Sequence, residues 1–199
     1  MKDSKIVFGG FDCDDDYPFC LDGVHFRHNE FRLTPSAKNY CFKSNECGSK
    51  FEFACAIHRP AIVWMNGPFQ ASVHDITMFR GGNETTDKKD WDRNALYWKM
   101  EELGEGKKGI GDGGYAGEPE KILVSKPGQS RELQEFLARA KNCEETLHTR
   151  FKSWNVLQVR FRHGKGTKER FDLHGDCVTA IAVITQYDFE NGRTPFEVR

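Results

Sequence analysis

Residues 51–66 read Phe51-Glu-Phe-Ala-Cys-Ala-Ile-His-Arg-Pro-Ala-Ile-Val-Trp-Met-Asn66. The first half alternates in the manner of a half-buried β-strand, and the run that begins at Ala61 is continuously apolar up to Asn66, as in a buried strand. Because only Arg59-Pro60 separates the two runs, we expect a tight hairpin of two strands. Gly67-Pro68 follows and is expected to end the second strand.

Outward from this hairpin, local patterns predict the other elements. Residues 19–26 form a short, β-prone run that carries Asp22 inside it, and the polar residues 27–50 predict a loop or a ragged hairpin. Downstream, the pattern predicts a short helix from Asp75 to Gly81, a helix over about 91–103, strands over 107–110 and 122–125, a long helix over 130–153 and a final helix over about 176–187. This order predicts an α/β domain in which a mixed sheet is flanked by helices. We assign this domain to residues 19–199 and treat residues 1–18 as a poorly defined lead-in.

The overall charge is balanced, with 29 Lys and Arg residues against 30 Asp and Glu residues. Net charge therefore neither favours nor excludes nucleic acid as a partner. The distribution is more informative, because residues 12–16 are acidic, whereas residues 150–170 are basic and contain a single acid, Glu169. Aromatic residues are interleaved with these basic residues, a pattern that suits a phosphate backbone and equally a solvated helix face.

The cysteine pattern and the hydropathy exclude several classes of protein. The seven cysteines are irregularly spaced and contain no CxxC pair, which argues against a zinc finger or ribbon. We find no signal peptide and no apolar run that approaches 18 residues. The sequence therefore predicts an intracellular protein with free thiols.

A carboxylate on a glycine-dense turn marks the segment Gly111-Asp-Gly-Gly-Tyr-Ala-Gly117. Glycines let a ligand approach the backbone closely, although an ordinary Asp-Gly turn has the same composition. A sheet with one covering helix could bring Asp112 close to Asp22 and to Glu144 or Glu145. Clustered carboxylates repel one another unless a cation lies between them. Oxygen ligands favour Mg²⁺ or Mn²⁺, and two such ions would activate water against a phosphodiester.

The two adjacent glutamates differ in their position on the long helix. Glu144 falls near the centre of the apolar stripe that runs from Leu133 to Phe151, whereas Glu145 falls well to one side. A buried, unpaired glutamate would be costly. Either the helix bends near Asn142-Cys143 or Glu144 itself lies near the metal.

Several motifs, taken together and in this order, resemble the DDE-superfamily endonuclease domain of Harbinger-type, transposase-derived proteins. The resemblance runs from about Leu21 to the C-terminus. Its motifs are Asp22-Gly-Val-His-Phe26, Ile62-Val-Trp-Met-Asn-Gly-Pro-Phe69, His74-Asp-Ile-Thr-Met-Phe-Arg80, Asp112-Gly-Gly-Tyr-Ala-Gly117, Glu145-Thr-Leu-His-Thr-Arg-Phe-Lys152, Arg160-Phe-Arg-His163 and Ala180-Ile-Ala-Val-Ile-Thr-Gln186. It implies an RNase H-like sheet and a divalent-metal-dependent DNA endonuclease.

The resemblance also implies a role for individual residues. Asp22, Asp112 and Glu145 would be the three catalytic acids and would bind two Mg²⁺ or Mn²⁺ ions. Asp75 matches a further motif residue and, like Glu144, is a candidate accessory acid. The remaining expected contacts are to DNA phosphates, through Lys152, Arg150, Arg160 and Arg162.

Two departures from the family pattern leave an alternative open. The motifs begin about twenty residues into the chain, so we expect the upstream DNA-binding segment to be lacking and a separate Myb-like partner to supply it. Cys143-Glu144 replaces the Arg-His that commonly precedes the third acid. The alternative is a domesticated or truncated protein of the same fold that binds DNA or a partner without catalysis. DNA as substrate implies a nuclear or cytoplasmic location, no membrane association, and room for a homo-oligomer.

Overall fold

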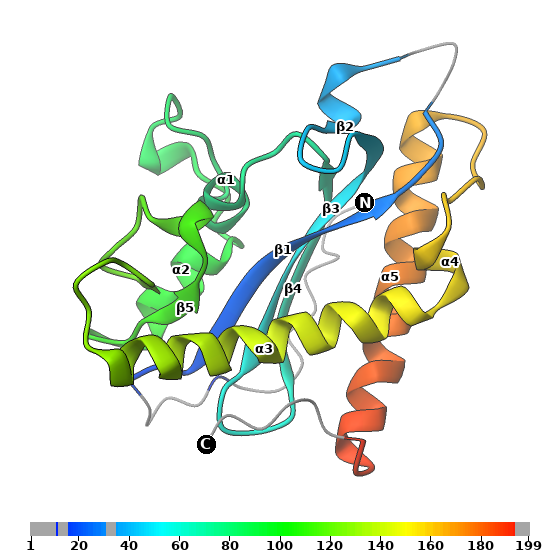
Figure 1. The fold of residues 1–199 in the computed structure, drawn as a ribbon. Helices are drawn as coiled ribbons and strands as arrows, with labels where there is room; N and C mark the ends of the chain where they lie inside the picture. The colour runs from blue at the N-terminus through cyan, green and yellow to red at the C-terminus, as the bar shows by residue number, and fades with distance from the viewer. Residues whose placement is uncertain (1–10, 12–15, 31–34, 194–199) are drawn as a thin grey trace.

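The computed structural model describes residue 11, residues 16–30 and residues 35–193. Most of the predicted lead-in, including residues 12–15 of the acidic segment, lies outside the described residues. The described chain forms a curled, mixed β-sheet flanked by helices (Figure 1). The predicted mixed α/β architecture is therefore confirmed.

The sheet has a long antiparallel part and a short parallel part. The central strand β3 pairs antiparallel with β1 on one side and with β4 on the other. On the far side of β1, β5 and then β6 continue the sheet in parallel. From one edge the strands are β4 (Ile62–Gln70), β3 (Glu46–Ala56), β1 (Phe19–Arg27), β5 (Gly109–Gly111) and β6 (Ile122–Val124), with the short β2 (Tyr40–Cys41) paired to the start of β3.

Each face of the sheet has its own apolar core. On one face, α3 crosses the strands and α5 packs beside it, so that buried side chains such as Phe53, Leu147 and Val178 form one cluster (Figure 1). On the other face, α1 and α2 cover a second cluster that includes Trp64, Phe79 and Tyr115. The helices are α1 (Asp75–Arg80), α2 (Leu96–Glu102), α3 (Arg131–Ser153), α4 (Asn155–Gln158) and α5 (Thr167–Glu190), with the 3₁₀ turns η1 (Ala37–Asn39), η2 (Lys88–Asp90) and η3 (Gly113–Tyr115).

Two predicted strand boundaries are wrong, and the sheet explains both. β4 does not end at Gly67-Pro68 but continues to Gln70, because a register shift opposite the segment between Lys50 and Glu52 accommodates one extra residue in β4. A proline is tolerated there because β4 is an edge strand and the bulge requires no ladder hydrogen bond from it. β3 begins at Glu46, inside the polar segment that was expected to be a loop or a ragged hairpin. Its antiparallel pairing with β2 shows that the hairpin alternative is the correct one.

The predicted bounds of α1 and α3 are correct, whereas those of α2 and α5 differ from the structure. Ser130 caps α3, where its hydroxyl accepts the Leu133 N–H at 3.2 Å. α5 begins at Thr167, nine residues before the prediction, because the buried side chains of its first turns are Arg170 and His174. These polar residues hide the helical period in the sequence. The predicted helix over 91–103 shortens to α2, and the short α4 was not predicted.

All six cysteines that the structure describes are free thiols, as expected. Within the described ranges, no helix has both the length and the apolar character needed to cross a membrane.

Candidate active site

Asp22 and Asp112 lie at the same level on two neighbouring strands. β1 and β5 run parallel with Cys20 opposite Ile110. Asp22 is two residues beyond Cys20, and Asp112 is two residues beyond Ile110, immediately after β5 ends. This register brings together two acids that are far apart in the chain. The predicted proximity of Asp22 and Asp112 follows from this pairing.

The Asp22 carboxylate is half-buried and close to other negative charges. Its Oδ1 accepts the backbone N–H of Gly23 at 2.7 Å. Burial, with smaller contributions from the charges of Asp112 and Asp75, raises the pKa of Asp22 to about 6, although the Gly23 hydrogen bond opposes this rise. A carboxylate whose pKa responds to two neighbouring acids in this way lies in a concentration of negative charge.

The Asp112 carboxylate is held by its own turn. Asp112 is the N-cap of η3, and its Oδ1 accepts the Gly114 N–H at 2.7 Å. The glycines of this turn serve two purposes. A Cβ at Gly114 would lie 2.7 Å from Asp75 Oδ2 and 2.9 Å from Asp112 Oδ1, whereas a Cβ at Gly113 would meet nothing within 4 Å. Gly114 therefore leaves room for two carboxylates, and Gly113 leaves the turn open to solvent.

Asp75, the first residue of α1, places its carboxylate beside Gly23 and Gly114, which follow Asp22 and Asp112 in the chain. Its Oδ1 would be 2.1 Å from a Cβ at Gly23, the residue after Asp22, and its Oδ2 faces Gly114. The Lys50 ammonium group pairs with Asp75 Oδ1 at 2.8 Å. A pocket of about 450 Å³ opens beside this residue, lined by His74, Asp75, Ile76, Thr77, Asn83, Glu84, Thr85 and Gly114. The structure thus gives Asp75 a central position among the acids.

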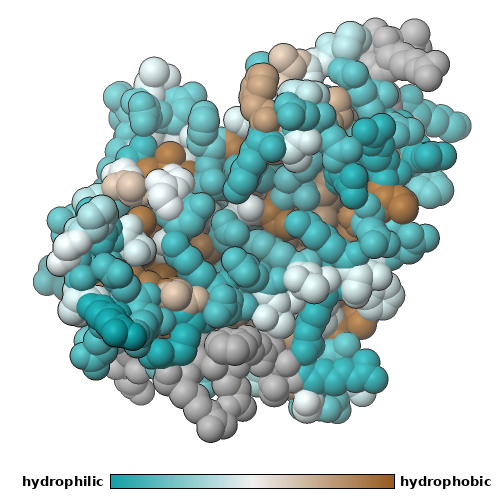
Figure 2. All heavy atoms as spheres, viewed as in Figure 1, coloured by the Kyte–Doolittle hydropathy of each residue, from teal (hydrophilic) through white to brown (hydrophobic). Residues whose placement is uncertain are grey.

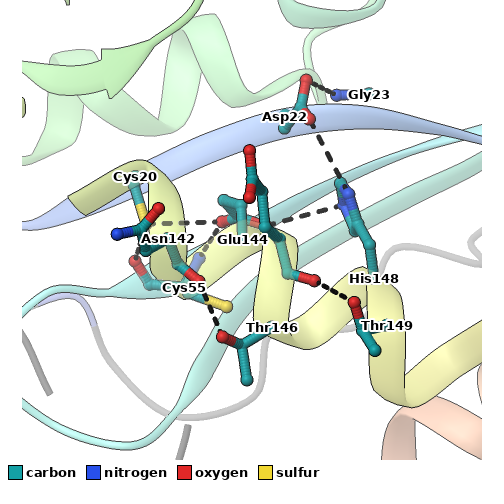
Figure 3. Close-up of polar contacts among 10 residues, drawn as sticks. Cys20, Asp22, Gly23, Cys55, Asn142, Glu144, Thr146, His148 and Thr149 are labelled. Atoms are coloured by element: carbon teal, nitrogen blue, oxygen red, sulfur yellow. Dashed lines mark hydrogen bonds and ion pairs between the residues drawn. The ribbon is translucent and has the colours of Figure 1, made fainter. Parts of the chain in front are cut away.

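Glu144 points from α3 into the sheet and is buried, as the helical stripe predicted (Figure 3). Its Oε1 accepts the Cys55 backbone N–H at 2.9 Å and the Cys20 thiol at 3.6 Å. Cys55 lies where the pairing of β3 with β4 changes register, so Glu144 satisfies a strand N–H at an irregular point of the ladder. Burial raises the pKa of Glu144 well above its usual range, and the charge of Asp22 adds to this effect.

His148 connects Glu144 to Asp22 and was not singled out from the sequence. It lies one turn after Glu144 on α3, with Nε2 3.8 Å from Glu144 Oε2 and Nδ1 3.7 Å from Asp22 Oδ2 (Figure 3). Burial, with a smaller contribution from Lys152, lowers the pKa of His148 to about 4, so the ring is neutral at pH 7. The four-residue spacing from Glu144 was the sequence signal that could have identified it.

Glu145 lies on the exposed side of α3, one residue beyond Glu144. The face of the molecule that α3 crosses is mostly hydrophilic (Figure 2). α3 runs without interruption from Arg131 to Ser153. On this turn of α3, Glu144 therefore faces the sheet and Glu145 faces outward.

Of the basic residues that were expected to contact phosphates, some are exposed to solvent and others make contacts within the protein. Lys152 and Arg162 are exposed, and Lys152 lines a pocket of about 270 Å³ together with His25 and other residues of β1 and β3. Arg160 is paired with Glu46 at 3.0 Å. Arg150 donates to a backbone carbonyl near the end of α5 and stacks over the Phe189 ring at 5.0 Å, so it links α3 to α5.

The chemistry of the aspartate group suits a hard cation, because Asp22, Asp75 and Asp112 offer only carboxylate oxygens. As the side chains stand, no three His, Cys, Asp or Glu residues in the part of the chain that the structure describes form a group that could hold a metal ion. The three aspartates instead bind partners within the protein, namely two backbone N–H groups and Lys50.

Searches of protein-family models, of curated proteins and of solved structures found no match to this chain.

Proposed function

We propose that this protein is a divalent-metal-dependent DNA endonuclease of the DDE type, with an RNase H-like sheet. The observation that carries the proposal is the shared level of Asp22 and Asp112 on the parallel strands β1 and β5. The strand order supports it as well. Three antiparallel strands in chain order are followed by two parallel strands on the far side of β1, with a helix from the C-terminal half across the face.

The cation would be held by Asp22 and Asp112 together with one glutamate of α3. Glu145 suits this third position better than Glu144. Glu144 already accepts the Cys55 N–H, and burial raises its pKa, which disfavours the carboxylate form that a cation needs. Glu145 is the next residue and lies on the exposed side of α3, so it is not occupied in binding a strand N–H. When bound, Mg²⁺ or Mn²⁺ ions would supply polarisation of the phosphodiester and a more acidic water.

The other residues of the site bind and orient the substrate. Gly113 has open space where a side chain would be, so a DNA backbone can approach the turn that carries Asp112. Lys152 lies two turns after Glu145 on the same helix and is exposed, where its ammonium group can contact a strand phosphate. Arg162 is similarly exposed, whereas Arg150 and Arg160 make contacts within the protein and would contribute less to DNA binding.

A plasmid-nicking assay tests this proposal. The wild-type chain is expected to nick supercoiled DNA with Mn²⁺ or Mg²⁺ and to stop when EDTA is added. Asp112→Asn and Glu145→Gln should each reduce the rate by about 100-fold or more, because each removes a charged ligand of the cation. Glu144→Gln should reduce the rate less than Glu145→Gln. If the folded wild-type chain does not nick DNA, or if Asp112→Asn nicks it at the wild-type rate, the catalytic proposal is refuted and the non-catalytic alternative is favoured.

A further inference from the structure

Lys50 is a basic residue that contacts the aspartate group of Asp22, Asp75 and Asp112, through Asp75. Its side chain extends from β3 and is only 15% exposed. The ammonium group lies 2.8 Å from Asp75 Oδ1 and donates to the Val73 carbonyl at 3.0 Å. Its Cε is 3.0 Å from the position of a Cβ at Gly23, which places it beside the residue that follows Asp22.

When no metal ion is bound, the three aspartates need a positive charge from the protein itself. Asp75 and Asp112 both act on Asp22 through their charges. Three carboxylates that lie this close would repel one another strongly in a partly buried site. The two backbone N–H groups that bind Asp22 and Asp112 contribute partial charges, whereas Lys50 contributes a full positive charge in direct contact with Asp75.

We propose that Lys50 is the resident counter-ion of the aspartate group, and that its ammonium group must leave Asp75 when a divalent cation binds. This inference rests on the proposed function, because two of the three aspartates, Asp22 and Asp112, are the proposed ligands of the cation. A cation among these carboxylates would lie close to the lysine, and two like charges in a partly buried site repel. Lysine suits the role because its point charge is carried on a flexible four-carbon stem, so it can swing out while β3 stays in place.

A purely structural role makes the opposite prediction about metal affinity. If the Lys50–Asp75 pair served only to attach α1 to β3, its loss would loosen the site, and metal binding would weaken or stay the same. If Lys50 competes with the metal, its loss removes the competitor, and metal binding tightens. The direction of the change in Mn²⁺ affinity therefore separates the two roles.

Titration calorimetry with Mn²⁺ on the full chain tests the inference with three variants. Lys50→Gln is expected to bind Mn²⁺ about ten-fold more tightly than wild type. It should also unfold at a lower temperature without metal and gain more thermal stability from Mn²⁺ than wild type gains. Lys50→Arg keeps the charge and should keep the wild-type affinity. Lys43→Gln removes an exposed charge that acts on Asp22 from a distance and should change the affinity much less.

A measurement on the wild-type protein makes the test independent of how the variants fold. Amine acylation followed by peptide mass spectrometry should show Lys50 reacting several-fold faster with saturating Mn²⁺ than with EDTA, because the ammonium group is released to solvent. Equal reactivity with and without bound Mn²⁺ would overturn the inference, as would an unchanged or weaker Mn²⁺ affinity in folded Lys50→Gln.

The outcomes also separate this inference from the proposed function. If wild type and Lys50→Gln bind Mn²⁺ equally, only the inference fails. If wild type binds none and Lys50→Gln binds it, the inference stands, whereas the proposed function of the natural chain fails. If neither binds Mn²⁺, both fail.

Discussion

Replacing Glu144 by glutamine is expected to flatten the pH dependence of this protein's stability above about pH 6.5. Burial holds the pKa of Glu144 well above its ordinary value of 4.5. Above pH 4.5 the unfolded chain has released this proton while the folded chain still holds it. The free energy of unfolding therefore falls as pH rises, by up to about 1.4 kcal/mol per pH unit, until the pH reaches the folded pKa.

Neighbouring groups determine the pH range in which this effect can be measured. His148 has its pKa lowered from 6.5 to about 4, so it makes stability rise with pH between those values and opposes Glu144 there. Asp22, with its pKa raised from 3.8 to about 6, makes stability fall over that lower range. Above about pH 6.5, Asp22 and His148 contribute little further change, so this range is where the raised pKa of Glu144 can be measured.

The assay is urea unfolding of wild type and Glu144→Gln with EDTA, at several pH values between about 6.5 and 8. The glutamine carbonyl can accept the Cys55 N–H in place of the carboxylate, so the variant should fold. Its stability should gain on that of wild type as pH rises. Glu144→Leu leaves the buried N–H without an acceptor and should be less stable by about 1–3 kcal/mol at every pH. Glu145→Gln, an exposed change one residue away, is the control.

Parallel stability curves for wild type and Glu144→Gln over this range would refute the reasoning. They would mean that Glu144 ionises alike in the folded and unfolded chains, and hence that the sheet does not bury it as a neutral acid. Equal stability of Glu144→Leu and wild type would separately refute its role as the acceptor of the Cys55 N–H.

Two further predictions concern single contacts in the same structure. Gly114→Ala places a Cβ 2.7 Å from Asp75 Oδ2 and should weaken Mn²⁺ binding about ten-fold in calorimetry. Gly113→Ala has open space at its Cβ and should bind Mn²⁺ as wild type does. Equal effects of the two substitutions would contradict the packing argument. Gln186→Met removes the acceptor of the Ile62 N–H, which lies at 2.9 Å, and should lower the free energy of unfolding measured in urea by about 1 kcal/mol. An unchanged free energy of unfolding would show that water takes the place of the Gln186 oxygen as acceptor.

Much of the fold could be predicted from the sequence because its signals are local. The alternation and apolar runs of residues 51–66 identified the hairpin of β3 and β4, and the helical period with Ser130 as cap identified α3. The same period predicts Glu144 on the buried side of α3, where the structure places it. These features depend on residues a few positions apart, which periodicity and capping rules describe well.

The misplaced boundaries arise where tertiary contacts override local preference. Gly67-Pro68 is a strong stop signal, but a bulge opposite β3 lets β4 continue. The first turns of α5 look like a basic linker, but Arg170 is buried and donates to the carbonyls of His163 and Gly164. A charged residue in a core position cannot be recognised from hydropathy alone.

The sequence alone established the kinds of residue available for chemistry, namely an aspartate in the first strand, another on a glycine-rich turn and two glutamates on one long helix. Their arrangement depends on the tertiary structure. The level of Asp22 and Asp112 follows from the pairing of Cys20 with Ile110, two residues 90 positions apart. Likewise, the roles of Glu144 and Lys50 follow from a strand N–H and a carboxylate that lie far away in the chain. Strand register and burial are set by such distant partners, and a local pattern carries no information about them.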